Sequence, residues 1–145
     1  MGGISPRDRR GARAPTDDLG GLVALVVDDE PVIRAFVARA LTLAGMEVAV
    51  AADGREAIRL VAENRVRPDV VVTDIEMPEM TGVELAARML ALRPALRIVM
   101  MTGDSVRAAA ARNHPSIVDH VLMKPVRISE LLEAVRPTRE HAPVP

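Results

Sequence analysis

Short runs of apolar, largely β-branched residues alternate along the chain with longer segments in which apolar residues recur every three or four positions. The short runs have no polar face, which is typical of strands buried on both sides in a parallel sheet. The longer segments are typical of amphipathic helices that pack one face against such a sheet. Five segments of each kind follow one another, so the pattern predicts an alternating α/β domain.

The boundaries of these segments follow from the apolar positions and from the Pro and Gly residues between them. Strands are expected at residues 22–27, 46–51, 70–72, 96–101 and 117–123, and helices at residues 31–44, 57–62, 83–92, 105–113 and 128–135. Right-handed crossovers leave few strand orders, and 2-1-3-4-5 is the order expected for a domain of this size. The predicted fold is therefore a doubly wound, flavodoxin-like (βα)5 domain with a five-stranded parallel sheet.

The two ends of the chain lack this periodicity. Residues 1–20 mix Gly, Pro, Arg and Asp, so we expect a disordered N-terminal tail. Residues 138–145 are expected to be a short C-terminal tail. Residues 21–137 are expected to form one domain, because a chain of 145 residues has room for little more.

Composition narrows the possible function classes. Hydrophobic residues make up 49% of the chain and Phe36 is its only aromatic residue, so the core is expected to be aliphatic. The net charge of -1 gives no basis for nucleic-acid binding, which usually relies on a basic surface. The absence of cysteine fits a reducing compartment, and no apolar run reaches the roughly 20 residues of a membrane span. Without a secretory signal either, we expect a cytoplasmic protein with no nucleic-acid or membrane partner.

Polar side chains stand where the expected strands end. Asp28 and Asp29 follow the first strand, Asp74 the third, Thr102 the fourth and Lys124 the fifth. Parallel strands share one carboxyl end, so these side chains are expected in one crevice at the point where the strand order reverses. Two carboxylates about 4 Å apart repel each other by about 4 kcal/mol at an effective dielectric constant near 20. A proton or a cation must relieve that repulsion, and oxygen ligands without sulfur or nitrogen favour Mg²⁺.

A carboxylate, a lysine, a hydroxyl and a divalent ion together can hold a phosphoryl group. Asp74, in the middle of the set, is the natural nucleophile. Lys124 and the ion would offset charge on the phosphoryl oxygens, and Thr102 would donate a hydrogen bond to one of them. The structural alternative is that the aspartates cap helices and form turns, as Asp29 could do for the first helix.

Four motifs in order, each at an expected strand end, make the chain resemble a known family. They are VVDDE at residues 26–30, TDIEMPEMTG at 73–82, MTGD at 101–104 and MKP at 123–125. On these motifs the chain resembles the receiver domain of a two-component response regulator, of the single-domain CheY-like kind. The resemblance covers residues 22–136.

The resemblance implies a role for each site residue. Asp74 would be the phospho-acceptor, Thr102 the switch hydroxyl, and Lys124 the partner of the phosphoryl group, preceding a proline that is often cis in this family. Asp28, Asp29 and Asp74 would hold Mg²⁺ or Mn²⁺, with the backbone carbonyl of Glu76 as a further ligand. Glu76 and Asp104, each two residues after a site residue, are expected to tune the dephosphorylation rate.

The resemblance also implies partners. The phosphoryl group would come from a histidine kinase or a histidine phosphotransfer protein, docking near Phe36 on the first helix. The signal would pass by protein contact to an unknown downstream target, with residues 105–136 as the output face. The family often has Tyr or Phe three residues before the lysine, where this chain has Val121, next to His120. Output is therefore expected to depend on the Thr102 loop or on His120 and not on an aromatic ring.

Three other functions are compatible with parts of the pattern. A small aspartyl-phosphate phosphatase or phosphotransferase shares the site residues but typically has a second Asp where this chain has Glu76. A receiver fragment of a hybrid histidine kinase would have the same residues as a single-domain protein. A nucleotide-binding domain of flavodoxin type would need a glycine-rich phosphate loop after the first strand, and none is present. As a receiver domain, the chain would catalyse only its own phosphorylation and dephosphorylation.

Overall fold

Five parallel strands form a single sheet in the order β2-β1-β3-β4-β5 in the computed structural model, which describes residues 19–137. The strands are β1 (Val23–Val27), β2 (Glu47–Ala51), β3 (Val70–Asp74), β4 (Arg97–Thr102) and β5 (His120–Met123). The helices are α2 (Pro31–Leu43), α3 (Gly54–Ala62), α4 (Gly82–Leu92), α5 (Ser105–Arg112) and α6 (Ile128–Val135). The predicted fold class and strand order are both confirmed.

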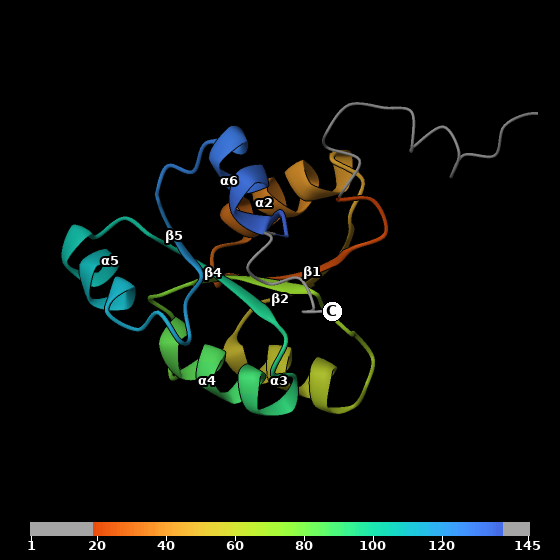
Figure 1. The fold of residues 1–145 in the computed structure, drawn as a ribbon, viewed down its shortest axis with the longest axis horizontal. Coiled ribbons are helices and arrows are strands. Elements are labelled where there is room, and N and C mark those ends of the chain that lie inside the picture. Colours follow the sequence, from red (N-terminus) through yellow and green to blue (C-terminus); the bar gives the residue numbers. More distant parts are fainter. Residues whose placement is uncertain (1–18, 138–145) are drawn as a thin grey trace, which may run out of the picture.

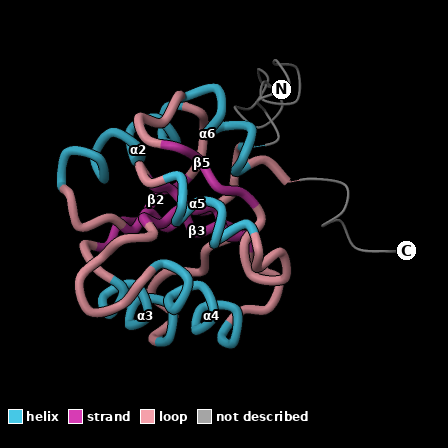
Figure 2. Tube along the Cα trace, turned by 90° about the vertical axis from the view of Figure 1, so that its left-hand side faces the viewer, coloured by secondary structure: helices cyan, strands magenta, loops and turns pink. Residues whose placement is uncertain are grey.

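The helices cover both faces of the sheet. Figure 1 shows α2 and α6 on one face and α3 and α4 on the other, and Figure 2 shows the strands as a layer between them. Helix α5 lies at the far edge of the sheet, where it contacts β4 and β5. Because the sheet is covered on both sides, its central strands β3 and β4 are buried at every residue.

The alternation of side chains along each strand divides the core into two clusters. Toward α3 and α4, the sheet contributes Leu25, Val27, Val71, Ile98 and Met100. Toward α2 and α6, it contributes Ala24, Val26, Val70, Val72, Val99 and Met101. Both clusters consist of aliphatic side chains and methionine, as the composition predicts.

Helices α3, α4 and α5 begin after residues whose side chains accept hydrogen bonds from their first backbone N–H groups. Asp53 accepts a hydrogen bond from the N–H of Glu56 at the start of α3, and Thr81 and Glu84 form a capping box at the start of α4. Pro31 occupies the first turn of α2, where its missing N–H costs no hydrogen bond. These sequence signals place the helix starts directly after the strand-end loops.

Several boundaries differ from the sequence prediction: α3 begins at Gly54 instead of residue 57, and β3 and β4 extend to Asp74 and Thr102. Strand β5 begins at His120 instead of residue 117, because the N–H groups of Ile117 and Val118 both turn back to the carbonyl of His114. Leu19 is fully buried, so core packing already includes a residue of the predicted N-terminal tail. Residues 1–18 and 138–145 lie outside the described residues. No helix among residues 19–137 is long and apolar enough to cross a membrane.

Candidate functional site

The carboxyl ends of the strands bring three sequence-predicted residues together. Asp28 follows β1 and Asp74 ends β3, and the pairing of Val27 with Thr73 places the two aspartates at adjacent positions. Lys124 follows β5, and its backbone N–H donates to the carbonyl of Thr102 at 2.8 Å. From there its long side chain reaches back across the sheet to the acids of β1 and β3.

The Lys124 ammonium is the centre of the cluster. Its Nζ lies 3.3 Å from Asp74 Oδ2, 3.4 Å from Asp28 Oδ2 and 3.5 Å from Glu30 Oε1. Asp28 is fully buried and Asp74 is 4% exposed. Lys124 is the only lysine in the sequence, and every other one of the 19 Lys and Arg residues is arginine. A compact ammonium on a flexible stem can approach three carboxylates at once, which the planar guanidinium of arginine does less well.

Burial decides the protonation behaviour of the two aspartates. It raises the pKa of Asp28, although the N–H of Glu30 and the charge of Lys124 partly offset it. Burial also raises the pKa of Asp74, and the charge of Asp28 adds to this against the opposing effect of Lys124. Burial disfavours the charged form of Lys124, but the charges of Asp28 and Asp74 outweigh it and raise the pKa of that amine. The pocket therefore holds more negative charge than its one lysine neutralises.

The raised carboxyl pKa predicts how stability responds to pH in the absence of metal. A carboxyl group with a higher pKa in the folded state weakens folding as pH rises from its ordinary value through the raised one. Asp74→Asn removes that titration, so its unfolding free energy, relative to wild type, should increase as pH rises from about 4 to 7 in chelator. Urea unfolding across this range measures the difference. The exposed Glu63→Gln is the control, and equal slopes for the two variants would contradict the prediction.

Glu30 joins the cluster, although its position in the sequence alone did not indicate this. Within residues 19–137, the acids that can offer carboxylate oxygens within 4.8 Å of one another are Asp28, Glu30 and Asp74. Glu30 has an extended backbone (φ -93°, ψ 112°), and alternate side chains of an extended segment point the same way. Asp29, between Asp28 and Glu30 in the sequence, is exposed and lines a small hollow with residues 52–55 and 78–80. The spacing of Asp28 and Glu30 was the signal that could have identified Glu30.

Thr102 is buried at the end of β4. Its hydroxyl contacts the loop that follows the neighbouring strand, β3. Its Oγ1 donates to Glu76 Oε1 at 2.9 Å and accepts from the N–H of Asp104 at 3.0 Å. Arg107 of α5 lies 3.2 Å from the second oxygen of Glu76 and 3.7 Å from Asp104 Oδ2. The sequence placed Thr102, Glu76 and Asp104 near the crevice, but it gave no reason to include Arg107.

The loop that follows Asp74 is held close to the strand end. The N–H of Gly82 donates to the carbonyl of Ile75 at 2.8 Å. A Cβ at Gly82 would lie 2.5 Å from the carbonyl oxygen of Asp74, so only glycine allows α4 to start this close. In the same loop, the N–H of Glu76 donates to Asp74 Oδ1 at 3.3 Å. The loop thus fixes one oxygen of Asp74 and leaves the other facing Lys124.

The remaining predicted position lies away from this cluster. Val121 is half-buried in β5 and lines a groove between β5 and α6 together with His120 and Glu133. The Lys124–Pro125 peptide bond is cis. No Phe, Tyr or Trp among the described residues lies near Val121, because the only one in the sequence, Phe36, is on α2.

Comparison with known proteins gives concordant results. A family profile described as "Response regulator receiver domain" matches residues 24–136. The response regulator MprA of Mycolicibacterium vanbaalenii is 38% identical over 113 residues, which cover 77% of this chain and 48% of that protein. The chain thus spans about half the length of the curated relatives that it matches.

Solved structures agree in sequence and in fold. The chemotaxis protein CheY4 of Vibrio cholerae is 35% identical with a TM-score of 0.67, and the match covers 77% of this chain and 93% of that one. A response regulator receiver domain protein of Clostridium thermocellum is 29% identical with a TM-score of 0.71, covering 79% of this chain and 90% of that one.

Proposed function

Because the chain belongs to the family of response regulator receiver domains, we propose that it accepts a phosphoryl group on Asp74 from the phosphohistidine of a histidine kinase or a histidine phosphotransfer protein. The observation that carries this proposal is the contact of Lys124 with Asp74 and Asp28 at 3.3 and 3.4 Å. A buried carboxylate beside a fixed ammonium is suited to attack phosphorus and to hold the product.

The transfer uses the oxygen of Asp74 that the loop leaves free. An Asp74 carboxylate oxygen forms the new P–O bond while the P–N bond to the donor histidine breaks and its electron pair returns to the imidazole. The charge of Lys124 partly offsets the effect of burial on Asp74, which favours the ionised form of that carboxyl group, and it would offset charge on the transferred group. Thr102 would donate a hydrogen bond to one phosphoryl oxygen, after its hydroxyl has left Glu76.

The donor atoms around Asp74 fit a divalent cation. Two buried carboxylates with raised pKa values, and Glu30 beside them, share one lysine, so added positive charge is favoured. All available side-chain ligands are oxygens, which suits Mg²⁺ or Mn²⁺. Asp28, Asp74 and the backbone carbonyl of Glu76 would hold the ion, joined by Asp29, whose carboxylate would have to turn toward the cluster of Asp28, Glu30 and Asp74. When bound, it would neutralise part of the negative charge that accumulates during phosphoryl transfer.

Two further assignments belong to the proposal. Glu76 and Asp104 would tune how quickly water removes the phosphoryl group, since both contact Thr102. The change would be passed on by protein contact through the surface around α5, β5 and α6, which includes the switch position Val121.

Stoichiometry and metal dependence test the proposal. Acetyl phosphate with Mg²⁺ should add one phosphoryl group per chain, and a chelator should lower that rate strongly, because the acidic pocket then lacks its cation. Intact-mass measurement with and without chelator reports both results. Repeated turnover of a small phosphate ester in excess over protein would instead favour a phosphatase.

A further inference from the structure

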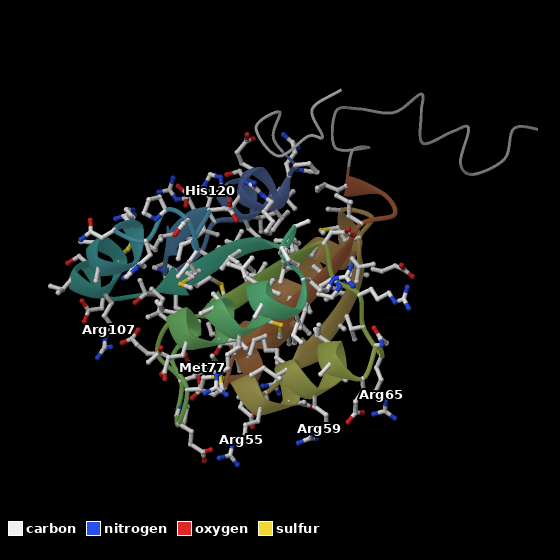
Figure 3. All side chains as sticks on the ribbon, turned by 60° about the horizontal axis from the view of Figure 1, so that its bottom comes forward. Arg55, Arg59, Arg65, Met77, Arg107 and His120 are labelled. Atoms are coloured by element: carbon white, nitrogen blue, oxygen red, sulfur yellow. The ribbon has the colours of Figure 1, made fainter. Side chains whose placement is uncertain are left out.

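The hydroxyl of Thr102 already has hydrogen-bond partners within the protein. It donates to one oxygen of Glu76 at 2.9 Å, and Arg107 holds the other oxygen at 3.2 Å. Figure 3 shows Arg107 extending from α5 on the side of the molecule where Met77 marks the loop after β3. This chain of contacts connects α5 to the end of β4 through the carboxylate of Glu76.

These hydrogen bonds matter because a hydroxyl has only one proton to donate. The carboxylate of Glu76 can only accept, so the Thr102 proton lies toward Glu76. The same hydroxyl already accepts from the N–H of Asp104 at 3.0 Å. Thr102 therefore cannot donate to Glu76 and to a phosphoryl oxygen on Asp74 at the same time. A residue that fixes Glu76 in place therefore opposes the hydrogen bond from Thr102 to the phosphoryl group.

We propose that Arg107 is a positioning residue that holds Glu76 in its contact with Thr102. The Thr102 hydroxyl would then leave Glu76 only when a phosphoryl oxygen accepts its hydrogen bond instead. The inference rests on the proposed function of Asp74 and adds a regulatory contact to that site. Arg107 fixes Glu76 through charge and geometry, while Asp104 at 3.7 Å keeps the guanidinium over the loop.

The N-terminal end of α5 can shift when the contact between Thr102 and Glu76 breaks. Its only fully packed residues are Ala108 and Ala111, so little apolar area resists a shift of its N-terminal end. Its first turn depends on Asp104, whose Oδ1 accepts from the N–H of Val106 at 2.8 Å and of Arg107 at 3.2 Å. When Thr102 turns away, the N–H of Asp104 loses its acceptor as well. A movement of Thr102 would thus be passed to α5 through Asp104, with no need for an aromatic side chain at position 121.

Beryllofluoride, a phosphoryl mimic, tests the inference on the intact chain with saturating Mg²⁺. Arg107→Ala should lower the half-saturating beryllofluoride concentration about two- to five-fold, the range expected for loss of an exposed ion pair. In a Glu76→Gln background, which keeps an acceptor for Thr102 but removes the charge facing Arg107, the same substitution should have no effect. Arg112→Ala, at the opposite end of α5, is the matched control and should bind like wild type.

Two readouts separate this inference from the proposed function. If wild type and Arg112→Ala bind beryllofluoride but Arg107→Ala binds identically, or shifts equally in the Glu76→Gln background, Arg107 has no positioning role. If wild type does not bind, the proposed role of Asp74 fails instead. Beryllofluoride should also speed hydrogen exchange at the amides of Val106 and Arg107 in wild type, and unchanged exchange there would refute the link to α5.

Discussion

Asp74→Asn is expected to abolish phosphoryl acceptance completely. The side-chain amide keeps the size of the carboxylate but has no ionised oxygen to attack phosphorus. Incubation with acetyl phosphate and Mg²⁺ should leave the intact mass of the variant unchanged, while wild type gains one phosphoryl group. Because burial raises the pKa of Asp74, the neutral amide should not destabilise the fold, so the loss will report chemistry and not unfolding.

Asp69→Asn is the matched control for this prediction. Asp69 stands just before β3, at the opposite end of the strand that ends in Asp74, and its carboxylate accepts from the N–H of Val23 at 2.8 Å. An asparagine oxygen can accept the same hydrogen bond, so this variant should gain one phosphoryl group at the wild-type rate. A phosphoryl group on Asp74→Asn would identify a different acceptor and end the proposed mechanism.

The fold was predictable because each local signal agreed with the global arrangement. Buried runs such as 70–72 have no polar face, so they fit only a sheet covered on both sides. Pro and Gly residues between the segments mark element boundaries independently of hydrophobicity. Once the strands are parallel, their carboxyl ends must share one edge, which brings Asp28, Asp74 and Lys124 near one another.

What the sequence did not reveal depends on side-chain directions and on contacts between distant elements. Asp29 and Glu30 are adjacent acids, and only the extended backbone at Glu30 turns its carboxylate toward Asp28 and Lys124. The contact of Arg107 with Glu76 joins α5 to the loop after β3, 31 residues apart, with no periodic pattern to signal it. The late start of β5 at His120, within the predicted strand 117–123, likewise depends on one carbonyl, that of His114.

Lys124 is expected to show the second largest effect. Lys124→Met should slow phosphoryl acceptance from acetyl phosphate by about 10²- to 10³-fold, the cost typical of removing one group that stabilises developing charge. Lys124→Arg should recover only part of the rate, because a planar guanidinium does not replace an ammonium that contacts three carboxylates at 3.3 to 3.5 Å. Time-resolved intact-mass measurement at saturating Mg²⁺ gives both rates.

Arg127→Met is the control for this pair of variants. Arg127 is exposed in the segment between Lys124 and α6 and makes no side-chain cap for that helix, so its loss should leave the rate unchanged. Full activity of Lys124→Arg would mean that positive charge alone suffices. Full activity of Lys124→Met would show that Lys124 has no role in phosphoryl acceptance.

The solitary lysine also allows its ionisation to be measured directly. Reductive methylation with ¹³C-formaldehyde labels Lys124 and the N-terminal amine only, and methylated lysine keeps its charge. In metal-free protein its titration should lie above that of a free lysine, because the charges of Asp28 and Asp74 outweigh burial. Asp74→Asn removes one of these charges and should lower the pKa, whereas Asp69→Asn should not. A Lys124 titration that is the same in wild type and Asp74→Asn would mean that these two groups do not interact in solution, and the proposed division of roles between them would fail.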